Sequence, residues 1–286
     1  MRLEQLWDLS RKSVRAWVDD YAPSMGAALA YYTLFSIAPL LIIAIAVAGL
    51  VFGQEAARGE IVAQIQGIIG QEGAIAVQGL LKSTNAPAQD IVALVVSSIT
   101  LIIGATTVFG ELQSDLDRIW RVPAAATENG LWTLLRKRLL SFGLVLGLGF
   151  LLLVSLIISA AIAAFGKWWD GFFAGGEALL HALDFSISFA ITTLLFAMIY
   201  KFMPRARIAW RDVWVGAAVT ALLFEIGKFF IGLYLGKTSV ASGFGAAASL
   251  VVLLVWVYFA AQIFLLGAEF TWVYSHEHGS KVVQTG

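Results

Sequence analysis

Two charged residues, Glu225 and Lys228, lie near the middle of residues 210–236, an otherwise mostly apolar stretch that is long enough to cross a bilayer. Charged side chains at membrane depth are costly, and they usually face a bundle interior or a water-filled cavity. Because the two residues are three positions apart, they share one face of a helix. Small residues on roughly the same side suit a buried helix–helix contact rather than lipid: Ala218, Ala221, Gly232 and Gly236. This spacing fits a gate or substrate-coupling pair. It equally fits a structural ion pair that neutralises itself and fixes helix packing.

A second group of polar side chains lies early in the chain. Tyr31, Tyr32 and Ser36 precede Pro39, which removes a backbone donor and should kink the helix. These side chains could line a cavity opened by a proline-broken helix, as in transporters. The alternative is ordinary helix packing around the kink, with the hydroxyl groups capping backbone carbonyls.

Three further polar residues could belong to the same pathway. Gln262 and Glu269 are seven positions apart on the last apolar stretch, so they are roughly aligned along a helix. Glu269 and Glu111 are both expected near the cytoplasmic ends of their helices, where they could form a polar cluster with Tyr31 or Tyr32. The alternative places each acid at the interface, either solvated or paired with an arginine.

Catalytic chemistry is not indicated by any motif. His276, Glu277 and His278 form a run in a polar tail, which is a weak metal signal. No acidic or histidine cluster of the kind that nucleases use, no GxxxxGK[ST] loop and no GxSxG elbow is present. The chain has no cysteine, which excludes disulfides and thiolate metal sites. We therefore predict no catalytic residue, no metal site and no cofactor, and expect that the protein is not an enzyme.

Composition places the chain in the membrane class. It is 59% hydrophobic and only 13% charged, whereas soluble domains carry about 25% charged residues. The net charge is zero, so there is no overall attraction to nucleic acid.

The apolar stretches predict an all-α, polytopic fold with six membrane-spanning helices in a single membrane domain of residues 1–286. Helices are expected rather than strands because a lone segment in lipid must satisfy its backbone internally. The predicted spans are residues 27–52, 91–110, 139–165, 183–203, 213–235 and 246–274. The second helix is expected to continue past residue 110 and stop at Pro123, and the fourth to end at Pro204.

Two amphipathic elements lie outside the spans. Residues 2–20, within the cytoplasmic segment 1–26, carry apolar side chains at helical spacing. They suggest a helix lying in the membrane interface or packed on the protein's own cytoplasmic face. Residues 54–89 are too polar to span and suggest an extracytoplasmic amphipathic helical hairpin between the first and second spans. Residues 275–286 form a polar tail.

The distribution of basic residues predicts the orientation. With six spans, fourteen Lys and Arg residues fall on the side of the termini and four on the other side. The positive-inside rule therefore places both termini in the cytoplasm. Lys228 is the one basic residue left inside the membrane. The basic loops could bind anionic lipid head groups, or they could serve as topology determinants and nothing more.

Several motifs resemble those of a known family. They are SMGAALAYYTLFSIAPLL, FGELQSDLDRIWRVP, EIGKFFIGLYLG and SLVVLLVWVYFAAQIFLLGAEFTWVY. Together they are similar to the YihY/virulence factor BrkB family of bacterial inner-membrane proteins, over roughly residues 10–275. This family was formerly labelled ribonuclease BN, a name held to be a misassignment. The resemblance implies an inner (plasma) membrane protein, and members are suspected of transport or of lipid-related roles at the envelope. The positions that match the family pattern are Ala30, Tyr31, Tyr32, Ser36, Pro39, Glu111, Trp120, Lys228, Tyr234, Gly267, Ala268 and Glu269.

These observations lead to one functional hypothesis with two alternatives. The first is a transporter or exporter of a small solute, ion or amphiphile through a central polar cavity. The alternatives are a lipid translocator or envelope lipid-homeostasis factor, and a non-transporting scaffold that assembles partners or forms a homo-oligomer. Expected partners are membrane lipids and an unknown solute or lipid substrate, but no nucleic acid. The candidate cavity residues are Tyr31, Tyr32, Ser36, Pro39, Glu111, Glu225, Lys228, Tyr234, Gln262 and Glu269.

Overall fold

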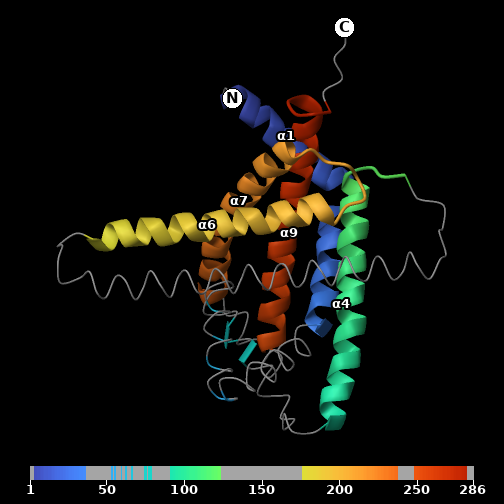
Figure 1. Ribbon diagram of the computed structural model, residues 1–286, viewed down its shortest axis with the longest axis vertical. Helices are drawn as coiled ribbons and strands as arrows, with labels where there is room; N and C mark the ends of the chain where they lie inside the picture. Colours follow the sequence, from blue (N-terminus) through green and yellow to red (C-terminus); the bar gives the residue numbers. More distant parts are fainter. Residues whose placement is uncertain are drawn as a thin grey trace. The chain divides into compact units, whose positions relative to one another are not determined.

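A computed structural model describes residues 3–36, 91–123, 176–237 and 248–281, with scattered single positions between 53 and 78. Every regular element in these ranges is helical (Figure 1). The helices are α1 (Leu3–Asp19), a helix over residues 22–36, α4 (Ile91–Ile119), α6 (Gly176–Phe202), α7 (Trp210–Lys237) and α9 (Ala248–Glu277). The all-helical prediction is therefore confirmed for the described part of the chain.

Three of the described helices are long and apolar enough to cross a membrane. The stretches concerned are Phe185–Phe202, Trp210–Tyr234 and Leu250–Glu277. They coincide with the predicted spans 183–203, 213–235 and 246–274. The predicted span 139–165 lies outside the described residues, as do residues 37–52 of the first span and most of the hairpin at 54–89.

The ends of two helices follow from local backbone chemistry. At the end of α4, Arg121 adopts a left-handed φ of 52°, and the Val122 N–H donates to the Asp117 carbonyl at 2.9 Å. This bond satisfies a carbonyl that the helix leaves free, and Pro123 cannot continue the helix. α1 ends in the same way, with Tyr21 at a φ of 59°. The predicted continuation of α4 past residue 110 is confirmed, and the helix ends at Ile119, four positions before the predicted stop at Pro123.

α1 is amphipathic, as predicted. Leu9 and Ser13 are buried, while Trp7, Val14 and Val18 are exposed by 74%, 49% and 55%. The helix therefore has one packed face and one apolar face open to its surroundings. A packed face fits the prediction of a helix on the protein's own surface, and the exposed face fits the prediction of an interfacial helix.

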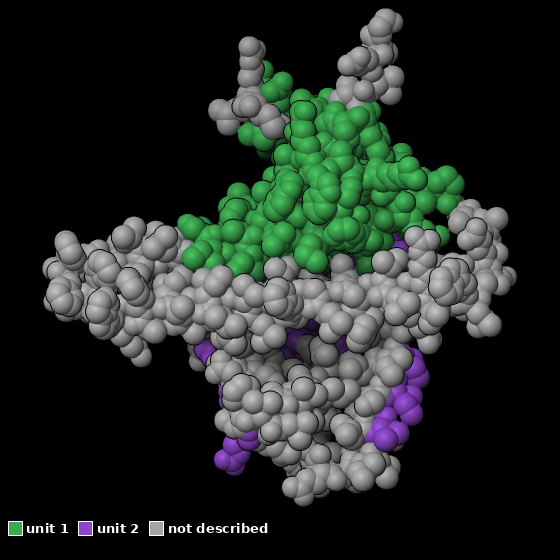
Figure 2. All heavy atoms as spheres, in the orientation of Figure 1, with its two compact units in different colours: residues 1–12, 116–222, 267–286 green, residues 13–115, 223–266 purple. Residues whose placement is uncertain are grey.

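The chain divides into two compact units (Figure 2). Unit 1 comprises residues 1–12, 116–222 and 267–286, and unit 2 comprises residues 13–115 and 223–266. The boundaries between these residue sets fall within α1, α4, α7 and α9. That residues 1–286 form one membrane domain stays a prediction.

Unit 2 has an apolar core formed by the end of α7 and the start of α9. Ile231, Val252, Leu253 and Trp256 pack with Val62, Ala74 and Val77, three described positions of the predicted hairpin segment. Elsewhere in the unit small residues allow close approach. A Cβ atom added at Gly26 would meet Gln262, and one added at Gly104 of α4 would meet Ser36.

Candidate functional site

Glu225 and Lys228 form an ion pair on α7, within unit 2. Lys228 Nζ donates to Glu225 Oε1 at 2.8 Å, and the side chains are 26% and 20% exposed for Lys228 and Glu225 respectively. Both residues belong to the candidate span that ends at Tyr234. Lys228 lies six positions from that end, roughly 9 Å of helix rise. The two charges therefore neutralise each other and are partly accessible, within a helix that is long and apolar enough to span a membrane.

Aromatic side chains flank one side of this pair. Lys228 Nζ lies 5.7 Å from the centroid of the Phe224 ring, and Phe224 meets Trp256 of α9 edge to face at 6.2 Å. Near the pair, a Cβ atom at Gly227 would collide with Ile263 of α9. The positions at 224 and 227 thus face α9, which places the pair at the border of the packed face.

The other side of α7 is open and apolar. Its exposed residues here are Leu222 at 50%, Ile226 at 47%, Phe229 at 67% and Phe230 at 60%. Exposed apolar groups on a membrane-spanning helix are suited to contact with lipid tails. The ion pair therefore lies between a helix–helix contact and an apolar surface.

The small-residue face that the sequence suggested around the pair is only partly present. Ala221 is fully buried. Gly232, however, is exposed, and a Cβ atom added there would meet no atom of the described residues within 4 Å. The expected close helix contact is therefore wrong at Gly232, because this position faces away from α9.

A close helix contact does occur in unit 1, where α6, α7 and α9 meet at glycine and threonine residues. A Cβ atom at Gly216 of α7 would lie 2.7 Å from Thr271 Cβ on α9. Reciprocally, a Cβ atom at Gly267 of α9 would lie 2.8 Å from Thr220 Cβ on α7 and 2.7 Å from Tyr200 Oη on α6. Each glycine thus receives the threonine of the facing helix. We call Tyr200, Gly216, Thr220, Gly267 and Thr271 the glycine–threonine seam.

The polar groups of the glycine–threonine seam satisfy one another. Tyr200 Oη and Thr220 Oγ1 lie 3.0 Å apart, and Thr220 Oγ1 donates to the Gly216 carbonyl at 2.7 Å. Thr271 Oγ1 donates to the Gly267 carbonyl, also at 2.7 Å. All three side chains are fully buried. Sequence reasoning missed this contact, although the Gly-x-x-x-Thr spacing at 216–220 and again at 267–271 follows the small-residue pattern of membrane helix contacts.

The candidate residues of the first predicted span are distributed over different surfaces. Ser36 is buried, donates to the Tyr32 carbonyl at 3.0 Å and faces Gly104 of α4. Tyr31 is 54% exposed, and its ring packs edge to face on Phe35 at 4.9 Å. The Ser36 contacts match helix packing with a hydroxyl cap. Pro39 lies outside the described residues.

Gln262 and Tyr234 have separate surroundings within unit 2. Gln262 Nε2 approaches the Pro23 carbonyl at 3.5 Å, while its Oε1 atom is buried without a hydrogen-bond donor among the described residues. Tyr234 is 49% exposed and meets Phe259 at 6.4 Å. Gln262 therefore presents a buried polar atom at a close helix contact, and Tyr234 lies on the outer surface of α7.

Glu269 is fully buried on α9, in unit 1. The alternative in which this acid is solvated at the interface is therefore wrong. Glu111 is half-buried on α4 and belongs to unit 2. A shared cluster of Glu111 and Glu269 stays a prediction.

Buried or partly buried aspartates form hydrogen bonds between segments of unit 1 that are far apart in the chain. Asp117 of α4 accepts from the Arg205 backbone N–H and from Arg205 Nε, both at 2.7 Å. The fully buried Asp212 of α7 accepts from Ser280 Oγ at 2.5 Å and from the Ser280 N–H at 3.1 Å. These bonds hold the turn after α6 to α4, and the tail after α9 to α7.

The tail residues that gave a weak metal signal point to different partners. His276 packs on Trp272 at 4.4 Å, and His278 stacks on Tyr274 at 6.3 Å. Glu277 instead accepts from Lys12. Among the described residues no group of three or more His, Cys, Asp or Glu side chains could hold a metal ion.

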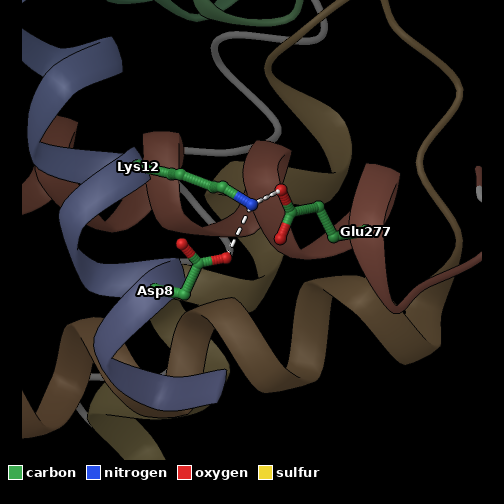
Figure 3. A network of polar contacts seen from close by, with 3 residues as sticks. All are labelled: Asp8, Lys12 and Glu277. Atoms are coloured by element: carbon green, nitrogen blue, oxygen red, sulfur yellow. Dashed lines mark hydrogen bonds and ion pairs between the residues drawn. The ribbon is translucent and has the colours of Figure 1, made fainter. Parts of the chain in front are cut away.

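Lys12 of α1 lies between two carboxylates (Figure 3). Its Nζ is 2.6 Å from Asp8 Oδ2 on the same helix and 2.5 Å from Glu277 Oε1 on α9. The hydrogen bonds to Asp8 and then to Glu277 raise the pKa of Lys12 above its ordinary value. Since the folded pKa is raised, the contact contributes fully below the unfolded value of 10.5 and is lost as the pH rises through the folded pKa.

We expect a Lys12→Met variant to be slightly less stable than the parent, by the same amount at all pH values from about 6 to 9, where Lys12 remains charged. The difference should shrink only as the pH rises above 10.5. The effect is small because the side chains are accessible to solvent. Unfolding midpoints across this range measure it, with Arg15→Gln as the control, since Arg15 lies 3.8 Å from Asp19 and is 83% exposed. If the stability difference between Lys12→Met and the parent changed between pH 6 and 9, the contribution of this contact would depend on a titrating group other than Lys12.

Comparison with known proteins places this helical architecture in a family. The sequence profile of the family described as Virulence factor BrkB matches residues 13–285. The chain belongs to this family. A UPF0761 membrane protein of Pseudomonas aeruginosa is 30% identical over 266 residues, which cover 91% of this chain and 61% of the relative. A UPF0761 membrane protein of Tolumonas auensis is 28% identical over 262 residues, covering 90% of this chain and 82% of the relative.

Family membership confirms the resemblance drawn from the sequence motifs. The chain is a membrane protein of the virulence factor BrkB family. It spans about three fifths of the length of the Pseudomonas relatives it matches. No solved structure matches the chain.

Proposed function

We propose that this protein is a transporter or exporter that moves a small solute, ion or amphiphile through a central polar cavity. It would sit in the bacterial inner membrane with six spans, both termini in the cytoplasm, no cofactor and no enzymatic activity. Support for the orientation comes from the fourteen basic residues on the side of the termini against four on the other. Support for the spanning helices comes from the three described stretches of suitable length and hydropathy.

The observation that carries the proposal is the Glu225–Lys228 pair within a spanning stretch of α7. Two charges at this depth are costly even when paired, and a purely structural contact could be made by apolar side chains. Both side chains retain about a fifth to a quarter of their exposure. A charged or zwitterionic substrate could therefore reach the pair and exchange one partner of the ion pair for its own charged group.

A second candidate function is lipid translocation, and one observation favours it. The exposed residues Leu222, Ile226, Phe229 and Phe230 border the pair on the same helix. An amphiphile could keep its acyl chains on this apolar surface while its head group reached Glu225 and Lys228. The third hypothesis, a scaffold that assembles partners or forms a homo-oligomer, requires no flux.

Proteoliposomes distinguish these functions. Currents on solid-supported membranes would be recorded with a panel of amino acids, organic anions and organic cations. In parallel, transfer of a fluorescent phosphatidylglycerol between leaflets would be followed by dithionite quenching. We expect currents with at least one soluble class and none in Lys228→Met. Lipid transfer without currents would favour the second candidate, and the absence of both would favour the scaffold.

A further inference from the structure

The turn between α6 and α7 combines exposed aromatic and basic side chains in unit 1. Phe202, Trp210 and Trp214 are exposed by 57%, 45% and 44%. Their rings form a continuous group, with Phe202 edge to face on Trp210 at 5.8 Å and Trp210 beside Trp214 at 6.4 Å. Large apolar groups at a turn are unusual on a surface that faces only water.

The position of this turn relative to the bilayer follows from the helices it joins. One candidate span ends at Phe202 and the next begins at Trp210. Residues 203–209 therefore lie where the chain leaves and re-enters the membrane. Tryptophan is favoured at this level because its ring is apolar and its N–H is polar.

Four basic residues lie in this turn or beside it in the sequence, and two of them already make contacts within the protein. Lys201 Nζ donates to the Ile208 carbonyl, and Lys201 also lies over the Trp210 ring at 5.4 Å. Arg205 binds Asp117 through its backbone N–H and its Nε, as described above. These two side chains hold the turn together.

The remaining two, Arg207 and Arg211, are exposed. Within the part of the chain that the structure describes, neither guanidinium has an ion-pair partner. Arg211 also follows Trp210 directly and is three positions from Trp214, so it lies beside the aromatic face of α7. The guanidinium group of Arg211 thus lies beside the exposed aromatic rings, and Arg207 belongs to the same turn, three positions before Trp210.

We propose that Phe202, Arg207, Trp210, Arg211 and Trp214 form a docking surface for anionic phospholipid. The aromatic rings would enter the region between head groups and acyl chains, and the two guanidinium groups would bind lipid phosphate, whose oxygens match their paired N–H donors. The exposed rings favour lipid over a free phosphate ion, because a soluble anion gains nothing from them. This surface is separate from Glu225 and Lys228 and does not depend on the proposed transport activity.

The test measures lipid binding to the purified full chain in detergent by native mass spectrometry. Phosphatidylglycerol and phosphatidylcholine with the same acyl chains are compared on the parent and on Arg207→Gln/Arg211→Gln. Two basic residues near an anionic lipid surface together strengthen lipid binding roughly 30-fold, so their removal should weaken binding by that factor. We expect that loss for phosphatidylglycerol only. The unfolding midpoint should stay unchanged, because neither side chain holds the turn.

A matched control variant distinguishes lipid binding at this surface from a general effect of the protein's net charge. Arg11→Gln/Arg15→Gln removes the same charge from α1, where both arginines are also exposed. Phosphatidylglycerol binding should be reduced much less in this control. An equal loss in both double variants would overturn the proposal, as would equal affinity for phosphatidylcholine. Binding of inorganic phosphate that is as strong as that of phosphatidylglycerol would overturn the choice of lipid.

Discussion

Replacing Gly267 by Ala is expected to lower the unfolding midpoint of the detergent-purified protein by roughly 5 °C, and Gly216→Ala should act similarly. The added Cβ atom at Gly267 would lie 2.7 Å from Tyr200 Oη and 2.8 Å from Thr220 Cβ. Both of these side chains are fully buried and hydrogen-bonded to each other, so neither can move aside without breaking a satisfied contact. The helices must separate instead, which loses packing that membrane helices depend on. Overpacking of this kind costs about 1–3 kcal/mol.

Gly232→Ala is the matched control for this prediction. Gly232 is also helical, but its added Cβ atom would meet nothing within 4 Å in the part of the chain that the structure describes. Alanine favours a helix over glycine by up to about 1 kcal/mol, so this variant should be as stable as the parent or slightly more stable. The sign of the change should therefore differ between positions 267 and 232. Equal midpoints for Gly267→Ala and Gly232→Ala would show that the glycine–threonine seam is not a tight contact.

Neutralising only one member of the ion pair is expected to reduce stability more than neutralising both. Lys228→Met leaves Glu225 within a spanning helix without its 2.8 Å partner, and Glu225→Gln does the same to Lys228. An uncompensated charge at this depth costs about 3 kcal/mol. The double variant Glu225→Gln/Lys228→Met carries no charge and should recover most of that loss. Folded yield and unfolding midpoints in detergent measure the effect.

This comparison requires the parent, both single variants and the double variant. The coupling free energy is the change in unfolding free energy of the double variant minus the sum of the changes in the two single variants. Tyr234→Phe on the same helix provides a control that leaves charge unchanged. A coupling energy near zero would mean that each side chain is stabilised by its surroundings rather than by its partner.

Much of the helical architecture could be predicted from the sequence because few solutions satisfy backbone groups in lipid. The spans at 183–203, 213–235 and 246–274 emerged from length and hydropathy alone, since a helix is the structure that a single apolar segment can form there. The helix ends near Pro123 and Pro204 followed from the missing N–H of proline. The alignment of Glu225 with Lys228 required only the helical repeat.

The contacts between helices could not be predicted in the same way. Arg205 and Asp117 are 88 positions apart, and Ser280 and Asp212 are 68 apart. The local sequence pattern does not indicate which helices become neighbours in the fold. The prediction that Gly232 belongs to a close contact was wrong because the residue type shows that a side chain is small but not which neighbour it faces. The spacing of Gly216 and Thr220 carried a usable signal, since it recurs at Gly267 and Thr271.

The role of the ion pair is tested most directly by flux through the double variant Glu225→Gln/Lys228→Met in proteoliposomes. This variant separates function from folding, because it is expected to fold without a buried unpaired charge. Using the substrate class that gives currents with the parent, the account predicts that the folded double variant loses at least about 90% of the flux, as expected for loss of a charged substrate contact worth roughly 1.4 kcal/mol or more. A folded double variant that carries substrate at the parental rate would contradict the account and assign Glu225 and Lys228 a purely structural role.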